Sequence, residues 1–142
     1  MIRVVIDTNV LVSGLWRPSG NCALVVDAVR SFGVTAVLDD RIFAEYAGVL
    51  RRPKLGLSVA TVERVLAHLA SDGERIVVGP TLVLPVADAA PDPKDLMFIE
   101  VAAATRVDAI VTGNERHFAW TRGLGLVVLS PAEFVERLRL GA

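Results

Sequence analysis

The sequence contains one cysteine, Cys22, and only two histidines, His68 and His117. A single cysteine excludes an internal disulfide and a cysteine-based zinc site. Proteins with so little use of cysteine are typical of a reducing compartment, so we predict a cytoplasmic protein.

Long apolar runs are also missing. The longest, such as residues 126–129, are far shorter than the roughly 20 residues that a membrane-spanning helix needs. The N-terminus reaches a charged residue within a few positions and has no signal-peptide cleavage pattern. We therefore expect no contact with a membrane.

Neither sign of charge is in excess. Fifteen Lys and Arg stand against sixteen Asp and Glu, for a net charge of −1, so the charge of the whole chain does not indicate a nucleic-acid binder. Any site for a polyanion must come from local clusters, for which solvated surface charge is the alternative interpretation. The residues that we predict to contact nucleic acid are Arg51, Arg52, Lys54, Arg116 and His117.

Hydrophobic residues, by contrast, are plentiful. They make up 53% of the 142 residues, which is enough for the core of one domain, and we assign residues 1–142 to it. Short β-branched runs alternate with helical patterns. Strands are predicted at 2–6, 34–38, 76–78, 109–111 and 126–129, and helices at 10–15, 21–31, 41–51, 59–71, 95–104, 114–118 and from 131 onward.

This alternation predicts the fold class α/β. Because the strands are apolar on both faces, they indicate a central parallel sheet of four to five strands covered by helices on each side, a three-layer α/β/α arrangement. Ligands of such sheets bind at the carboxyl ends of the strands.

Acidic and amide side chains fall at that same edge. Asp7 directly follows the first strand, and Glu45 lies early in the helix after the second. Asp92 and Asp95 open the helix that leads into the 109–111 strand, and Asn114 follows that strand. Topology alone therefore predicts that these residues, which come from four separate positions in the chain, converge on one edge of the sheet.

Carboxylates that crowd together raise one another's pKa values unless a cation lies between them. Oxygen ligands without a His or Cys cluster favour Mg²⁺ or Mn²⁺ over zinc. Such ions activate water and stabilise charge on phosphate, which suits phosphodiester hydrolysis.

Each acid also has a structural interpretation. Asp92, followed by Pro93, is a favourable helix N-cap, and Asp95 would then meet the helix dipole. Asp7 could cap the 10–15 helix, and Glu45 could be an exposed helix acid.

In their order and spacing, these motifs resemble PIN-domain nucleases, and specifically the VapC-like toxins of toxin–antitoxin systems. The matching segments are 7–13 (DTNVLVS), 45–46 (EY) with 49–54 (VLRRPK), 92–95 (DPKD) with 98–103 (FIEVAA), 111–114 (VTGN) with 117–118 (HF), and 129–134 (LSPAEF). The resemblance implies a PIN-like fold and metal-dependent endoribonuclease activity.

By position, Asp7, Glu45 and Asp95 match the family's first three acids, which implies catalytic and metal-binding roles. Many members carry a fourth acid where this chain has Asn114. That difference removes one negative charge from the site. Asn114 could still coordinate a metal ion through its side-chain carbonyl, or Asp92 could take over the role of the fourth acid.

The resemblance further implies that Thr8, Asn9 and Thr112 orient the carboxylates. It implies RNA as substrate, an antitoxin protein as partner and a homodimer.

Two other functions remain open. The chain could be a PIN-fold module that binds RNA or protein without catalysis, as Asn114 and the weak net charge would allow. It could also be a phosphotransfer protein with Asp7 as nucleophile. Such proteins generally need a lysine near the phosphate, and neither Lys54 nor Lys94 follows a clear strand.

Overall fold

The computed structural model describes residues 2–31, 33–80, 82, 84 and 92–141. Within them the strands are β1 (Ile2–Ile6), β2 (Val34–Leu38), β3 (Glu74–Arg75), β4 (Ala109–Val111) and β5 (Val128–Leu129). The helices are α1 (Thr8–Trp16), α2 (Asn21–Arg30), α3 (Asp40–Leu50), α4 (Val59–Asp72), α5 (Leu96–Thr105), α6 (Glu115–Phe118) and α7 (Pro131–Arg139). Short 3₁₀ helices occur at η1 (Pro53–Leu55), η3 (Pro93–Asp95) and η4 (Ala119–Leu124).

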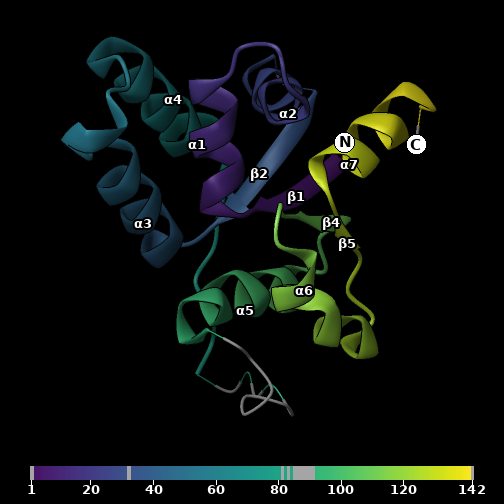
Figure 1. Cartoon of the computed structure of the whole chain (residues 1–142). Coiled ribbons are helices and arrows are strands. Elements are labelled where there is room, and N and C mark those ends of the chain that lie inside the picture. The colour runs from purple at the N-terminus through teal and green to yellow at the C-terminus, as the bar shows by residue number, and fades with distance from the viewer. Residues whose placement is uncertain (1, 32, 81, 83, 85–91, 142) are drawn as a thin grey trace.

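The strands form one parallel sheet in the order β3-β2-β1-β4-β5. Strand β1 lies at its centre, where Val4 pairs with Ala36 of β2 and with Ala109 of β4. Helices α1, α2 and α7 cover one face, and α5 and α6 cover the other (Figure 1). The predicted three-layer α/β/α fold with a parallel sheet is therefore confirmed.

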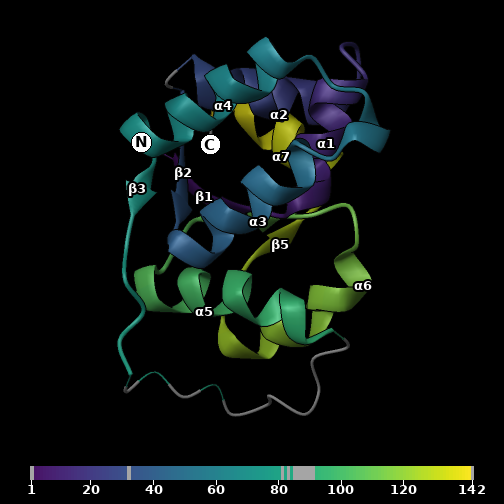
Figure 2. The same cartoon turned by 90° about the vertical axis from the view of Figure 1, so that its left-hand side faces the viewer.

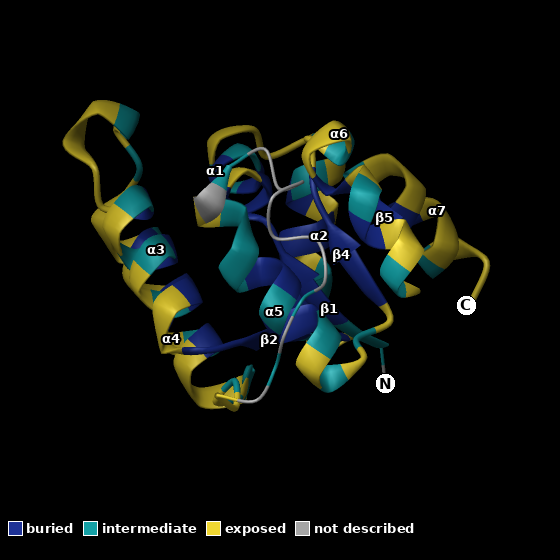
Figure 3. Ribbon diagram, turned by 90° about the horizontal axis from the view of Figure 1, so that it is seen from below, coloured by how far each residue is buried: buried dark blue, intermediate teal, exposed yellow. Residues whose placement is uncertain are grey.

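Burial explains why these segments form the layers. Every residue of β4 is buried, as are the last three of β1, and Figure 3 shows these strands enclosed by helices whose outer faces are exposed. Helix α5 packs against β1, β2 and β4 through Phe98, Ile99, Val101 and Ala102. Viewed from the side, α3 lies in front of the sheet, with α4 above it and α5 below (Figure 2).

The third predicted strand is displaced. We expected residues 76–78, whereas β3 is Glu74–Arg75, and Val77 is 89% exposed. Two interactions hold the strand at this position. Its residues pair with β2, and the Glu74 side chain binds the Arg3 guanidinium of the central strand. The last strand is likewise shorter than predicted, and the first helix begins at Thr8 rather than at Val10.

Two local features hold the helices in place. Ser130 and Glu133 form a capping box at the start of α7, with Pro131 in the first turn as predicted. Helices α1 and α2 approach so closely at Gly14 that a Cβ atom there would lie 2.6 Å from Val26 Cγ2 and 2.7 Å from the Cys22 carbonyl oxygen.

None of the helices described is both long enough and apolar enough to cross a membrane.

Candidate functional site

Asp7 is held at the carboxyl end of β1. Its backbone N–H donates to the carbonyl oxygen of Val111 at 2.9 Å, so the neighbouring strand β4 determines where the residue lies. The side chain is only 7% exposed, and its Oδ2 atom accepts a 2.8 Å hydrogen bond from the Thr112 hydroxyl. Burial raises the pKa of Asp7 despite hydrogen bonds from Thr112 and the Thr8 N–H, and the nearby Glu45 raises it further.

Thr112 connects Asp7 to the loop after β4. Its side chain is fully buried, and its hydroxyl oxygen accepts a 3.0 Å hydrogen bond from the Asn114 backbone N–H while donating to Asp7. The role of Thr112 in orienting a carboxylate stays a prediction, and the hydrogen bond to Asp7 supports it. Asn114 itself is exposed, and its N–H is the group seen to take part.

Asp95 is the second acid of the site. It ends η3, its side chain is 14% exposed, and its Oδ2 atom is buried with no hydrogen-bond partner among the described residues. Nδ1 of His117 lies 3.7 Å from that oxygen, which is too long for a hydrogen bond. Burial, followed by repulsion from Asp7 and Asp92, raises the pKa of Asp95 to about 6.

Asp92 caps the turn that carries Asp95. Its Oδ1 atom accepts a 2.9 Å hydrogen bond from the Lys94 N–H, and its carbonyl oxygen accepts one from the Asp95 N–H at 3.0 Å. The capping interpretation of Asp92 is therefore confirmed, one 3₁₀ turn ahead of α5. Its charge still acts on the site, because it raises the pKa of Asp95.

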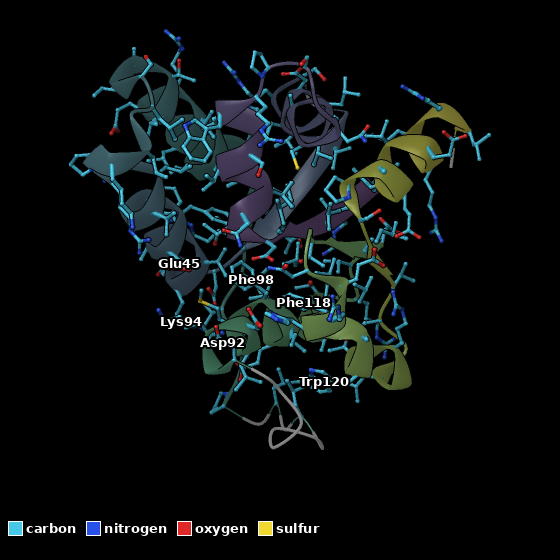
Figure 4. The ribbon with its side chains drawn as sticks, in the orientation of Figure 1. Glu45, Asp92, Lys94, Phe98, Phe118 and Trp120 are labelled. Atoms are coloured by element: carbon cyan, nitrogen blue, oxygen red, sulfur yellow. The ribbon has the colours of Figure 1, made fainter. Side chains whose placement is uncertain are left out.

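Glu45 approaches from α3. It is half-buried and lines a pocket of about 580 Å³ between α3 and the start of α5, together with Lys94, Met97 and Glu100. Figure 4 shows Glu45, Lys94 and Asp92 on the same side of the molecule. The effect of Glu45 on the pKa of Asp7 places both carboxylates in one electrostatic environment.

Tyr46 is a residue that sequence reasoning missed. Its hydroxyl donates to the carbonyl oxygen of Ile6, and its ring lies 6.4 Å from that of Phe98 on α5. The side chain is fully buried, and burial raises the pKa of its hydroxyl. The available signal was that the only tyrosine of the chain directly follows Glu45.

The predicted convergence of three acids around one ion is not present as a compact cluster. Among the residues described, no three His, Cys, Asp or Glu side chains stand close enough together to hold a metal ion. Mg²⁺ needs fewer protein ligands, because it usually keeps several waters and binds through one or two carboxylates. The buried, unpartnered Oδ2 of Asp95 and the repulsion from Asp7 fit an ion of that kind.

The other predicted site residues make no side-chain contact with these acids that the structure describes. Arg51 makes two hydrogen bonds to Glu63, and with Arg52 it lines a separate pocket at the end of α3. Lys54 is exposed on η1. The remaining residues are Asn9 and Arg116, both exposed, and Thr8, whose hydroxyl is buried without a hydrogen-bond partner among the described residues.

Comparison with known proteins places this chain in a family. The model of the PIN domain matches residues 3–116, which include Asp7, Glu45, Asp95 and Asn114. An uncharacterized protein, MJ1680, of Methanocaldococcus jannaschii is 28% identical over 144 residues, covering 95% of this chain and 90% of its own.

A solved structure shares the fold. The crystal structure of VapBC2 from Rickettsia felis bound to a DNA fragment from their promoter contains a chain that superposes with a TM-score of 0.56 at 17% identity. The match covers 92% of this chain and 98% of that one. The family model, which matches well over half of the chain, shows that this protein belongs to the PIN-domain family.

Proposed function

We propose that this protein is an endoribonuclease that depends on Mg²⁺ or Mn²⁺ and acts as the toxin of a toxin–antitoxin pair. PIN domains are generally nucleases, so family membership supports phosphodiester hydrolysis. The observation that carries the metal is the Oδ2 atom of Asp95, which is buried beside Asp7 with no hydrogen-bond donor among the described residues. A buried carboxylate oxygen is costly unless a proton or a cation satisfies it.

In this proposal Asp7 and Asp95 hold the ion, and Glu45 adds a third carboxylate from the pocket between α3 and α5. A divalent ion supplies water activation and charge neutralisation on the phosphate when bound. Thr112 keeps the Asp7 carboxylate oriented through its 2.8 Å hydrogen bond. His117 is half-exposed and lies 3.7 Å from Asp95, which supports the proposal that it contacts the substrate.

Cleavage assays test the enzyme directly. Wild-type protein is expected to cut RNA with Mn²⁺ and to stop when EDTA is added. Asp7→Asn and Asp95→Asn are expected to lose at least two orders of magnitude in rate, because interactions of this kind contribute several kcal/mol to transition-state stabilisation. The matched control is Asp27→Asn, an exposed carboxylate on α2. Equal cleavage by Asp7→Asn and wild type would refute the proposal.

The toxin role adds partners. The Rickettsia felis structure with the same fold is described as VapBC2, a toxin–antitoxin complex. From that likeness we propose that an antitoxin blocks the edge of the sheet where Asp7 and Asp95 lie. From the family resemblance we also propose that this chain forms a homodimer. A short neighbouring reading frame whose product co-purifies with the protein and inhibits cleavage would support the toxin role, and the oligomeric state can be measured by sedimentation.

A second function, binding without catalysis, is favoured by the exposed Asn114 in place of an acid and by the missing three-acid cluster among the described residues. Calorimetric titration with Mn²⁺ separates the two. Binding that Asp95→Asn abolishes supports the nuclease, whereas no binding at millimolar metal supports the inert module. The phosphotransfer alternative gains no support from membership in the PIN family.

A further inference from the structure

A second pocket lies beside the candidate active site. Its volume is about 370 Å³, and it is lined by Ser13 and Arg17 of α1, Asn21 and Cys22 of α2, Gly113 of the loop after β4, and Ser130 at the start of α7. We propose that this phosphate pocket binds a phosphate group of the nucleic-acid strand next to the one that is cut. The inference rests on the proposed function above.

The order of the β-strands in the sheet places the pocket on the path that a bound nucleic acid would follow. The strands run β2, β1, β4, β5, so their carboxyl ends follow one another along a single edge. Glu45 comes after β2, Asp7 after β1, and Gly113 after β4, while Ser130 follows β5. A strand of nucleic acid that crosses this edge therefore passes Asp7 in the middle and reaches the phosphate pocket at one end.

Gly113 gives the direct connection. It lies between Thr112, whose hydroxyl donates to Asp7, and Asn114, whose N–H donates to that same hydroxyl. The phosphate pocket thus begins where the acid site ends, one residue away along the chain. A Cβ atom at Gly113 would meet nothing within 4 Å, so the backbone is open on this side.

The charge in the pocket favours an anion. Arg17 is the only charged residue that lines it, and it forms no salt bridge within the part of the chain that the structure describes. Every other lining side chain is neutral, so no carboxylate competes for the guanidinium. The planar guanidinium of arginine can donate two parallel N–H hydrogen bonds to two oxygens of one phosphate.

Neutral donors complete the lining. The Asn21 side chain offers an amide N–H₂ and Ser13 a hydroxyl. Helix α2 begins at Asn21, and its N-cap residue Gly20 has no side chain to cap it. The first backbone N–H groups of the helix therefore have no intrahelical acceptor and add to the donors. Together with Arg17 these groups suit the tetrahedral oxygens of phosphate rather than an apolar or cationic ligand.

Binding measured without cleavage tests this pocket. A fluorescein-labelled single-stranded RNA is titrated with wild-type protein in EDTA, and a gel confirms that the RNA stays intact. We expect Arg17→Ala to weaken binding about five- to tenfold and to reduce the slope of log affinity against log salt by about 0.7, the value for one phosphate on a single strand. Asn21→Asp, which places a carboxylate in the pocket, is expected to weaken binding similarly.

The matched control is Arg30→Ala, which removes an exposed arginine from the opposite end of α2. It is expected to bind RNA as wild type does. The proposal is overturned if Arg17→Ala binds like wild type, or if Arg30→Ala weakens binding equally, because the effect would then be one of overall charge.

Two further comparisons complete the test. The first identifies which phosphate of the RNA binds in the pocket, and the second distinguishes a failure of the pocket proposal from a failure of the nuclease proposal. RNA with and without a 5′-phosphate distinguishes a chain-end phosphate from an internal phosphodiester: a loss confined to the phosphorylated RNA assigns the former, and an equal loss assigns the latter. Cleavage by wild type with an unchanged Arg17→Ala affinity refutes the pocket alone. Failure of metal-dependent cleavage with a reduced Arg17→Ala affinity refutes the nuclease and leaves the pocket in place.

Discussion

The hydroxyl of Tyr46 donates a hydrogen bond to the backbone carbonyl of Ile6, the residue before Asp7. This bond connects α3, which carries Glu45, to the end of the central strand. The Tyr46 ring also packs near Phe98 of α5, the helix that begins after Asp95. One buried side chain of the helix that carries Glu45 therefore contacts both the strand that ends before Asp7 and the helix that begins after Asp95.

Removing that hydroxyl should affect both stability and activity. Tyr46→Phe keeps the ring but leaves the Ile6 carbonyl without its donor, so we expect a loss of about 1–2 kcal/mol in the free energy of unfolding. We also expect slower RNA cleavage, because Glu45 loses its fixed position relative to Asp7. Urea unfolding and initial cleavage rates measure the two effects.

The control for this variant is Thr105→Val, which removes a hydroxyl-to-carbonyl hydrogen bond at the far end of α5. It should lower stability without slowing cleavage. If Tyr46→Phe cleaves RNA at the wild-type rate, Tyr46 supports the fold but does not position Glu45.

The raised pKa of Asp95 predicts how stability depends on pH. The folded protein holds the Asp95 proton up to about pH 6, whereas the unfolded chain releases it near pH 3.8. Ionised Asp95 therefore destabilises the fold above pH 6, by at most about 3 kcal/mol at 1.36 kcal/mol per pKa unit. Without metal, Asp95→Asn should be more stable than wild type at pH 7.5, and the gap should narrow as the pH falls from 6 toward 3.8. Urea unfolding across this range measures it, and a gap that stays constant would contradict the assignment.

A divalent ion should reverse that disadvantage. At pH 7.5, Mn²⁺ is expected to raise the melting temperature of wild type, with about 2.7 kcal/mol of stabilisation at one hundred times the dissociation constant. Asp95→Asn should show little of this effect, whereas the control Asp27→Asn should respond as wild type does. Equal responses in all three proteins would place the metal elsewhere.

Thr112 provides a pH test of the Asp7 carboxylate. The hydrogen bond that the Thr112 hydroxyl donates to Asp7 lowers the pKa of Asp7. Thr112→Val removes this hydroxyl, so the pKa of Asp7 should rise further. Because the proposal needs ionised Asp7, the acidic limb of the cleavage profile should move to higher pH. Thr112→Ser retains the hydroxyl and should keep the wild-type profile. An unshifted Thr112→Val profile would mean that this hydrogen bond does not govern Asp7.

The close approach of α1 and α2 gives a stability prediction. In Gly14→Ala the new Cβ would lie 2.6 Å from Val26 Cγ2 and 2.7 Å from the Cys22 carbonyl, so we expect a loss of about 1–3 kcal/mol. Gly48→Ala on α3 meets nothing within 4 Å and should leave stability unchanged or raise it by up to about 1 kcal/mol. Thermal unfolding compares the two, and a Gly14→Ala protein as stable as Gly48→Ala would show that the helices can separate there.

Some features of this protein follow from local sequence. The continuous apolar run before Asp7 predicts a buried central strand, and the strand–helix alternation predicts the parallel sheet, because both depend on the spacing of neighbouring side chains. The capping roles of Asp92 and Ser130 also act within three residues. The order of the strands along the chain was then enough to bring Asp7, Glu45 and Asp95 to the same edge.

Other features depended on partners that are distant in the sequence. Arg51, a predicted RNA contact, binds Glu63 on α4, and β3 lies at Glu74 rather than at Ile76, where it pairs with β2 and Glu74 binds Arg3. The Tyr46 hydroxyl likewise binds a carbonyl far away in the sequence, that of Ile6. Four separate segments of the chain line the pocket at Arg17. Local sequence therefore determined the elements and which edge carries the acids. Only the tertiary structure decided how buried each acid is and what it contacts, because both are set by side chains that packing brings together from distant parts of the chain.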